Sequence, residues 1–330
     1  MSGASRLLDV AHAAGVSLRT ASRVLNDDPR VASLTRQRVR EAMRDLRFQP
    51  DAMARSLRAG TDTAIGFVVE SISDPFFAEV IDAVELEMSR HGRSVLVTST
   101  RRDPDWERDV IGRMTQRRIA GLLLSPTGDD HSWLDTRRVP VVLVDRPAPG
   151  LSADLIEIDD HRAAFDATAH LIAHGHRRIA YVGDTPAIPT SAARLRGYRD
   201  ALARHQVAAD ESLVSTDGST SQAAARVVSA MVSGARPPTA ILSAATRASL
   251  GVVPALHSAG RTDIALVSFG DFPMADALRP AVTVVDHPGH EIGRTAAARL
   301  LARLGQPGLP VERIQVPAPI IERGSGELRP

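Results

Sequence analysis

Apolar residues recur at α-helical spacing in three short stretches within the first 48 residues. They are Val10, Ala11 and Ala14 in the first stretch, Ala21, Val24 and Leu25 in the second, and Val39, Ala42, Met43 and Leu46 in the third. Side chains three and four residues apart share one face of a helix. The pattern therefore predicts three short helices that bury these faces against one another.

The connection between the first two helices has residues typical of a tight turn. Gly15 tolerates a positive φ, and the Ser17 hydroxyl can accept a hydrogen bond from a backbone N–H at the start of the second helix. The opposite side of that helix carries Leu18, Arg19, Thr20, Ser22 and Arg23. These features favour a helix-turn-helix whose second helix reads DNA. The alternative is a helical hairpin that only packs.

Residues 48–60 form the expected junction with the rest of the chain. Pro50 suits the first turn of a helix, and residues 52–58 allow about two turns, too few to be stable alone in water. Leu57 has arginines close to it in the chain, a combination that can wedge the leucine into a minor groove. The alternative is a flexible linker with a single stray leucine.

From residue 65 onward, short apolar runs alternate with helical segments. The predicted strands are 65–70, 94–100, 120–126, 139–147, 155–160, 177–184, 214–216, 239–244, 264–271, the start of 281–305, and 311–320. The predicted helices are 76–92, 106–116, 162–174, 193–205, 221–233, 247–259 and the remainder of 281–305. This alternation favours doubly wound parallel sheets in two similar α/β halves, about 60–160 and 161–285. Ligands of open α/β sheets lie beyond the carboxyl ends of the strands, so a cleft between the halves is the expected ligand site.

Charge is distributed unevenly along the chain, although the formal net charge is only +1. Residues 1–60 contain eleven arginines and six carboxylates, a net charge of +5, and the other 270 residues carry a net charge of −4. A basic front part on a mildly acidic body is typical of a DNA-binding module attached to another domain. The alternative is an ordinary solvated basic surface.

The sequence offers little for catalysis, metal binding or membrane insertion. There is no cysteine, which suits a reducing cytoplasm, and no apolar run has the length of a signal peptide or a membrane span. No serine lies in a nucleophile elbow, and no glycine-rich loop leads to a lysine. The spacing of His12, His170, His174, His176 and His290 includes no paired carboxylate or cysteine. We therefore expect a cytoplasmic protein that is not an enzyme and uses neither metal nor cofactor.

Five motifs follow one another along the chain: DVAHAAGVS with TASRVLN, then TRQRVREAM, PDAMARSL, HLIAHGHRRIAYVGD and RLRGY. In this order they resemble the lactose-repressor/galactose-repressor (LacI/GalR) family of bacterial transcription regulators over essentially the whole chain. The resemblance implies an all-α helix-turn-helix headpiece followed by a two-lobed, periplasmic-binding-protein-like core of doubly wound parallel sheets. The implied boundaries are 1–47 for the headpiece, 48–60 for a hinge helix, 61–161 with 288–319 for one lobe, and 162–287 with 320–330 for the other.

The resemblance also implies which residues contact DNA. Leu18, Arg19 and Arg23 fall at positions that read base edges, and Leu18, which has no hydrogen-bonding group, suits a thymine methyl. The implied phosphate contacts are Thr20, Ser22, Asn26 and Arg30. Leu57 matches a leucine that enters the minor groove, with Ala54 against its partner copy.

For the pocket, the resemblance implies eight effector-binding residues: Asp74, Phe76, Phe77, Asp145, Arg194, Thr246, Asp271 and His287. Several positions depart from the family pattern. Relatives usually have an Asn-Asp pair where this chain has Ala245 and Thr246, and often an aspartate at Gly270. Some sugar binders place a stacking tryptophan near Gly218. A sugar is the first expectation for the effector, and a different ligand, or none, is the alternative.

The expected function is that of a homodimeric transcription factor, a repressor as in most of this family, on a pseudo-palindromic double-stranded operator. A small molecule between the lobes would control it. The alternative is a solute-binding protein of the same two-lobed fold without a DNA function. The arginine-rich front and the missing signal peptide argue against that alternative.

Overall fold

The computed structural model describes residues 6–25, 28–46, 48 and 64–330. The chain divides into two compact units, residues 1–62 and 63–330, and each is described by itself. Asn26, Ala54 and Leu57, three of the expected DNA-contact residues, lie outside the described residues. Their roles therefore stay predictions.

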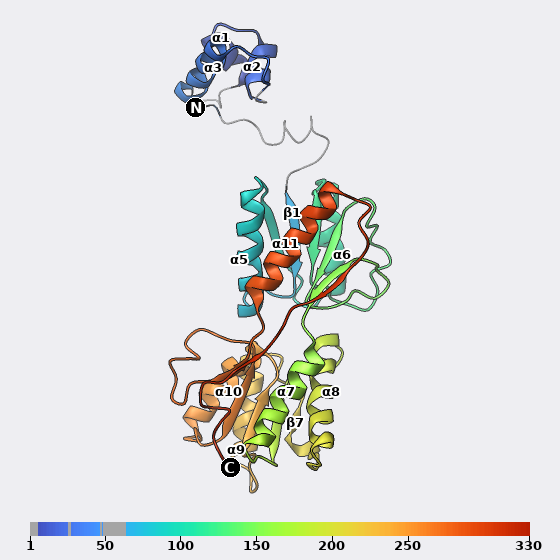
Figure 1. The fold of residues 1–330 in the computed structure, drawn as a ribbon, viewed down its shortest axis with the longest axis vertical. Coiled ribbons are helices and arrows are strands. Elements are labelled where there is room, and N and C mark those ends of the chain that lie inside the picture. Colours follow the sequence, from blue (N-terminus) through green and yellow to red (C-terminus); the bar gives the residue numbers. More distant parts are fainter. Residues whose placement is uncertain (1–5, 26–27, 47, 49–63) are drawn as a thin grey trace. The chain divides into compact units, whose positions relative to one another are not determined.

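The described part of the first unit contains α1 (Leu7–Ala13), α2 (Leu18–Leu25) and α3 (Ser33–Asp45), as the apolar pattern predicted (Figure 1). Its buried core is made of Val10, Ala11, Ala14, Ala21, Val24, Val39 and Ala42. Gly15 has a φ of 64° in the turn before α2, and the Ser17 Oγ accepts a hydrogen bond from the Thr20 N–H at 3.2 Å. These contacts fix α2 against the other two helices and leave its opposite side outside the core.

The second unit contains two sheets, each with helices on both faces. The sheet of the first lobe is entirely parallel, in the order β11-β5-β4-β3-β1-β2. Its strands are β1 (Ile65–Val69), β2 (Val95–Ser99), β3 (Gly121–Leu124), β4 (Val141–Val144), β5 (Asp154–Glu157) and β11 (Arg313–Gln315). Every residue of β1, β3 and β4 is buried. They are continuous apolar runs because a parallel strand between two helical layers meets no solvent on either face.

The helices of the first lobe are α5 (Pro75–Arg90), α6 (Pro104–Gln116) and α11 (Gly289–Gly305). Residues of α5 and α11 share one buried cluster with Phe67, and those of α6 share another with Val68. Because neighbouring residues of a strand point to opposite faces, α5 and α11 cover one face of the sheet and α6 covers the other. Figure 1 shows α5 and α11 side by side.

The sheet of the second lobe has the order β12-β10-β9-β8-β6-β7 and is parallel except for the antiparallel pair of β10 and β12. Its strands are β6 (Ile179–Val182), β7 (Val214–Ser215), β8 (Ala240–Ser243), β9 (Ala265–Phe269), β10 (Thr283–Val285) and β12 (Ile320–Ile321), and the short helix η1 (Glu211–Leu213) leads into β7.

The helices of the second lobe are α7 (Asp160–Ala173), α8 (Pro189–Arg204), α9 (Ser221–Val232) and α10 (Thr246–Ser258). Residues of α7 and α8 belong to one buried cluster, and those of α9 and α10 to another. A Cβ atom at Gly197 of α8 would lie 2.2 Å from the carbonyl oxygen of His161 in α7, so only glycine permits this approach of the two helices.

The chain passes between the lobes three times: after β5, after β10, and between β11 and β12. The prediction of a single final strand over residues 311–320 is wrong. β11 pairs with β5 in the first lobe, whereas β12 pairs with β10 in the second. Pro317 and Pro319 lie between them, and proline has no N–H to give to a ladder, so the strand is interrupted where the chain crosses.

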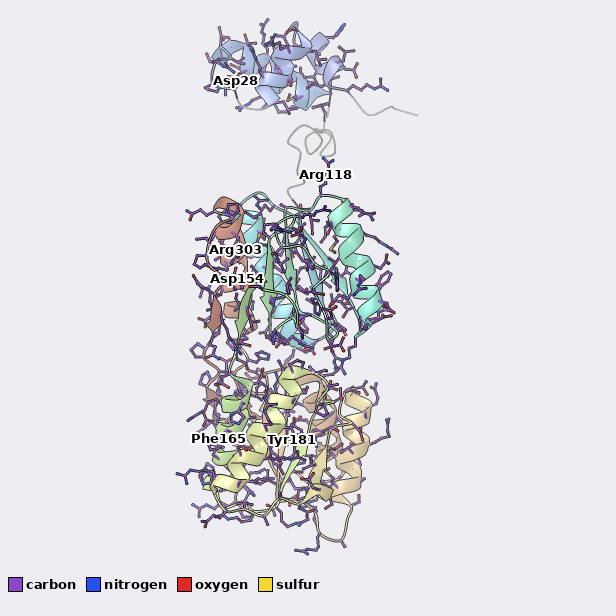
Figure 2. All side chains as sticks on the ribbon, turned by 90° about the vertical axis from the view of Figure 1, so that its right-hand side faces the viewer. Asp28, Arg118, Asp154, Phe165, Tyr181 and Arg303 are labelled. Atoms are coloured by element: carbon purple, nitrogen blue, oxygen red, sulfur yellow. The ribbon has the colours of Figure 1, made fainter. Side chains whose placement is uncertain are left out.

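A buried ion-pair cluster at Asp154 holds α11 against the first sheet (Figure 2). Asp154, at the start of β5, is fully buried. Its Oδ1 accepts hydrogen bonds from Arg303 Nη2 at 3.0 Å and from the Glu312 N–H at 2.8 Å, and it lies 3.1 Å from Arg299 Nη2. One carboxylate therefore joins β5, α11 and the segment that leads into β11.

Candidate functional site

The first candidate surface is the side of α2 that faces away from the core of the first unit. Leu18, Arg19 and Arg23 are exposed there, and Thr20 and Ser22 are half-buried beside them. Leu18 keeps 48% of its surface exposed. Exposed donors and an apolar side chain on one rigidly held helix suit contact with base edges in a major groove.

Asp28, just beyond α2, engages two of the arginines near this surface. Its Oδ1 accepts from Arg30 Nε at 2.9 Å, its Oδ2 accepts from Arg30 Nη2 at 2.8 Å, and Arg23 Nε lies 3.8 Å away. Arg30 first, and Arg23 to a lesser extent, hold the pKa of Asp28 at about 2. Arg30, an expected phosphate contact, therefore already has an ionised partner within the protein, with which a phosphate would compete.

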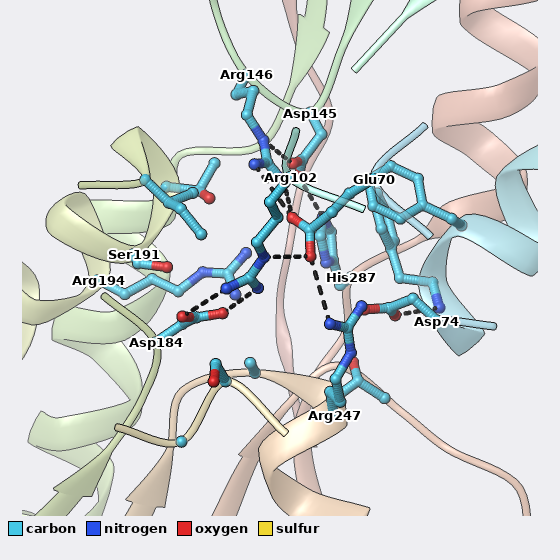
Figure 3. Close-up of a pocket in the computed structure, with 18 residues that line it drawn as sticks. Glu70, Asp74, Arg102, Asp145, Arg146, Asp184, Ser191, Arg194, Arg247 and His287 are labelled. Atoms are coloured by element: carbon cyan, nitrogen blue, oxygen red, sulfur yellow. Dashed lines mark hydrogen bonds and ion pairs between the residues drawn. The ribbon is translucent and has the colours of Figure 1, made fainter. Parts of the chain in front are cut away.

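The second candidate site is a pocket between the two lobes of the second unit (Figure 3). It lies where strands of both sheets end, as expected for α/β sheets. The space among its lining atoms is about 540 Å³ when the adjoining open solvent is included. Seven of the eight expected effector residues line it: Asp74, Phe76, Phe77, Asp145, Arg194, Thr246 and His287.

Asp271, the eighth expected residue, is not among the residues that line the pocket. Its carboxylate instead accepts a hydrogen bond from Arg323 Nη1 at 2.9 Å. The preceding Gly270, which stands where relatives often have aspartate, has a φ of 87°, and a Cβ there would lie 2.1 Å from Thr246 Oγ1. Thr246 thus occupies the space of a side chain at position 270, and the placement of Asp271 in the pocket is corrected.

The nearby Gly218 does line the pocket, but it leaves no room for a larger side chain. A Cβ at this position would lie 2.8 Å from the carbonyl oxygen of Gly183. A stacking aromatic residue at position 218 would therefore require the backbone to shift.

Five further charged residues, which were not predicted from the sequence, also line the pocket. They are Glu70, Arg102, Arg146, Asp184 and Arg247. Four of them follow closely on the ends of β1, β2, β4 and β6, and Arg247 lies in the first turn of α10. Their position at or near the carboxyl ends of predicted strands, or at the start of a predicted helix, was a usable signal. The pocket is consequently much more charged than the expected residues alone suggested.

Glu70 is the centre of this charged group. Its Oε1 accepts from Arg102 Nε at 2.8 Å and from Arg247 Nη1 at 3.4 Å, and its Oε2 accepts from Arg146 at 3.4 Å. Burial alone would raise the pKa of Glu70, but Arg146, Arg102 and Arg247 together lower it below its ordinary value. Glu70 is therefore an ionised, buried carboxylate that three guanidiniums stabilise.

Arg194 is buried on the second-lobe side of the pocket. Its Nε donates to Asp160 Oδ1 at 2.6 Å and its Nη1 to the Ala244 carbonyl at 2.9 Å, while its guanidinium carbon lies 3.8 Å from the centre of the Phe269 ring. These contacts fix the plane of the guanidinium. A rigid fork of N–H donors suits hydroxyl or carboxylate recognition.

His287 offers the pocket a ring nitrogen without a partner. Its ring stacks on Phe76, with the ring centres 3.7 Å apart. No described residue forms a hydrogen bond with its buried Nε2, which lies 3.7 Å from the Asp145 Oδ1. Burial, assisted by Arg194 and Arg146, lowers the pKa of His287 well below 6.5. The ring is therefore neutral at physiological pH.

We expect His287 to make the protein less stable as the pH falls below about 6.5. The unfolded chain takes up a proton near that pH and the folded chain does not. At a pH one unit lower, this difference at His287 should therefore have reduced the free energy of unfolding by about 1.4 kcal/mol. The measurement compares urea unfolding of wild type and His287→Gln between pH 7.5 and 5.5. The difference in free energy of unfolding between wild type and His287→Gln should change by this amount over the pH range. The other titrating groups are common to both proteins, so their contributions cancel in this difference. A difference that does not vary with pH would contradict the buried neutral ring.

Comparisons with known proteins agree with this arrangement. The sequence profile of bacterial regulatory proteins of the lacI family matches residues 6–51, and that of the periplasmic binding protein-like domain matches residues 168–326. The HTH-type transcriptional regulator GalR of Escherichia coli is 32% identical over 310 residues, which are 92% of this chain and 90% of that protein. The HTH-type transcriptional repressor CytR of Escherichia coli is 30% identical over 307 residues, 91% of this chain and 90% of that protein.

Two solved structures have the same fold over nearly the whole chain. The lac repressor dimer bound to operator and the anti-inducer ONPF has a TM-score of 0.86 at 23% identity, covering 98% of this chain and 99% of that one. The transcriptional regulator CelR–cellobiose complex has a TM-score of 0.72 at 26% identity, covering 97% and 99%.

A helix-turn-helix unit followed by a two-lobed, periplasmic-binding-protein-like unit defines the class of DNA-binding transcriptional regulators with an effector pocket. Among the described residues, no helix combines the length and apolar character that a membrane crossing requires. With relatives at 30% identity or more over nine-tenths of its length, the chain belongs to the lacI family of bacterial regulatory proteins.

Proposed function

We propose that this regulator is a repressor that binds a pseudo-palindromic operator as a homodimer and responds to a small polar effector in the inter-lobe pocket. The observation that carries the effector part is the pocket itself. It combines a fixed guanidinium on Arg194 of α8 with an unpartnered ring nitrogen on His287, just after β10, and both side chains are buried. A few fixed polar groups in a concave site are what orient a small ligand.

A sugar or related metabolite is the proposed effector class. Hydroxyl groups can both donate and accept, and the pocket supplies carboxylate acceptors and guanidinium donors close together. Binding of cellobiose by CelR, a structural relative, supports this choice. The effector would act by its difference in affinity for two arrangements of the lobes, one of which is competent to bind DNA.

At the operator, we assign base reading to Leu18, Arg19 and Arg23. Thr20, Ser22, Asn26 and Arg30 are assigned to phosphates, which position the protein without specifying sequence. The two copies of α2 in a dimer would lie in successive major grooves about one helical turn apart. The exposure of Leu18, Arg19 and Arg23 on a rigid helix supports this assignment.

Replacing Leu57 by alanine is expected to weaken binding to the specific operator while binding to unrelated duplex changes little. The proposed leucine wedge acts only on DNA that is bent at the operator centre, so its loss removes a contact absent from the non-specific complex. Gel shifts with operator and with scrambled duplex measure both affinities, and His91→Ala serves as an exposed control. Equal losses on both duplexes would exclude the wedge.

The proposed function is tested by gel shifts of the full chain with DNA upstream of its own gene, with and without candidate sugars. We expect a specific complex whose affinity falls steeply with salt, because phosphate contacts release counterions. An effector should change the operator affinity, and it should bind the protein in the absence of DNA as well. A protein that binds sugars but no duplex would instead be a solute-binding protein, and the proposal would fail.

A further inference from the structure

Arg102 lies in the pocket on an unusual turn of the backbone. Arg101 and Arg102, which follow Thr100 after the end of β2, have φ values of 56° and 65°. Left-handed backbone costs about 1–2 kcal/mol for a residue with a Cβ atom, and here two such residues are adjacent. Backbone strain of this kind persists only where other contacts compensate for it, and it often marks a functional position.

The contacts that compensate come from both lobes (Figure 3). The Arg102 Nε donates to Glu70 Oε1 of its own lobe at 2.8 Å. Its Nη1 donates to Asp184 Oδ1 of the other lobe at 3.0 Å, and its Nη2 donates to the second oxygen of the same carboxylate. Glu70 and Asp184 are 5% and 8% exposed, so one guanidinium bridges two buried carboxylates across the cleft.

A second arginine makes the reciprocal connection. Arg247 of the second lobe donates to Glu70 at 3.4 Å and to Asp74 at 3.1 Å, both in the first lobe. Each lobe therefore sends an arginine to carboxylates of the other. Together with Arg146, which also contacts Glu70, these side chains leave only about 60 Å³ in which the centre of a water-sized molecule fits. The lobes are already joined, and the space between them is nearly filled by the protein's own side chains.

We propose that Glu70 and Asp184 form a cation site that spans the two lobes, and that Arg102 occupies this site from within the chain and keeps the lobes closed without a ligand. The ligand class that could take the place of Arg102 is a small cation with several N–H donors, because a bidentate guanidinium is what the Asp184 carboxylate now binds. A neutral molecule in that place would leave the buried Asp184 carboxylate without a counter-charge, which is strongly unfavourable. A sugar effector would therefore contact Arg194 and His287 and leave Arg102 in place. This inference rests on the proposed function in one respect: it takes closure of the two lobes to be the motion that is regulated.

The test measures the distance between the lobes in the full chain without DNA. The protein has no cysteine, so Ser89→Cys on α5 and Ser229→Cys on α9, both exposed, accept spin labels without competing sites. The labelled wild type is mixed with excess unlabelled chain, so that a dimer carries only one labelled copy. With no ligand added, electron–electron double resonance should then give one narrow distance distribution. In the Arg102→Ala background the distribution should broaden and acquire a second population that the wild type lacks.

Methylguanidinium is the probe that separates a cation site from general destabilisation. At millimolar concentration it should restore the wild-type distribution in Arg102→Ala, while equal concentrations of sodium chloride should not. Asp184→Asn should open the lobes as Arg102→Ala does, but methylguanidinium should not close them again, because the carboxylate that binds the cation is gone. Arg113→Ala is the matched control, since Arg113 is an exposed arginine of the same lobe that pairs within α6 with Asp109.

The proposal is overturned if the distribution is the same in Arg102→Ala and wild type, or if methylguanidinium has no more effect than sodium chloride. If Arg102→Ala does not fold, as judged by circular dichroism, the Asp184→Asn variant is the test. Lobes that open in this variant support the proposal, and lobes that stay closed overturn it. None of these measurements uses DNA, so failure of operator binding in the gel shifts would refute the proposed function and leave this result standing.

Discussion

Replacement of Asp160 by alanine is expected to lower the free energy of unfolding of the second unit by about 3–5 kcal/mol at pH 8. Asp160 and Arg194 are 6% and 7% exposed, and their side chains are 2.6 Å apart. Without Asp160, the guanidinium stays buried without a counter-charge. Burial raises the pKa of Asp160 to about 7 in spite of Arg194, which shows how costly charge is at this depth. The measurement is made at pH 8 so that the carboxylate is ionised.

Asp166→Ala is the matched control for this prediction, because Asp166 lies on the same helix and pairs with Arg162 at the surface. Exposed pairs at this spacing contribute only about 0.3–0.5 kcal/mol. Urea unfolding followed by tryptophan fluorescence measures both variants, since Trp106 and Trp133 both lie in the second unit. The double variant Asp160→Ala, Arg194→Met should recover much of the loss, because it removes the unpaired charge. Similar effects of Asp160→Ala and Asp166→Ala would show that the buried pair is not structurally important.

Arg19→Ala and Arg23→Ala are each expected to reduce specific operator affinity by roughly 5- to 150-fold, since a base contact by arginine contributes about 1–3 kcal/mol. Neither side chain helps to fill the core of the first unit, so folding should not change. Each loss of affinity should depend on particular base pairs of the operator. The affinity for duplexes in which those base pairs have already been changed should fall much less.

The comparison is made by gel shift with a set of single-base operator variants. Arg226→Ala is the control, because Arg226 is an exposed arginine on α9 of the second unit. A uniform loss across all duplexes would assign Arg19 and Arg23 to phosphate contact instead of base reading. That outcome would leave the role of the helix-turn-helix intact and change only the roles of these two residues.

Most secondary-structure elements could be predicted from local pattern, because each depends on residues close together in the chain. The apolar face of α2 and the buried run of β4 are examples: helical spacing or a continuous apolar stretch determines both. The last predicted strand failed for the opposite reason. Its first part pairs with β5 and its second part with β10, and those strands belong to different sheets.

The pocket could be predicted only in part. Family resemblance led to Asp74, Phe76, Phe77, Asp145, Arg194, Thr246 and His287, all of which line it. It also led to Asp271, whose direction depends on the left-handed turn at Gly270 and on the partner Arg323. The direction of a side chain after such a turn is not contained in the local pattern of apolar and polar residues.

The sequence by itself determined the order of strands and helices, the apolar faces that bury them, and the basic first unit, because these follow from composition and from spacing within a few residues. The tertiary structure alone decided which charges meet. Three ion pairs of the pocket show this. Arg102 is 32 residues from Glu70 in the chain and 82 residues from Asp184, and Arg247 is 177 residues from Glu70. An ion pair depends on distance in space, and only the folded chain brings these residues together.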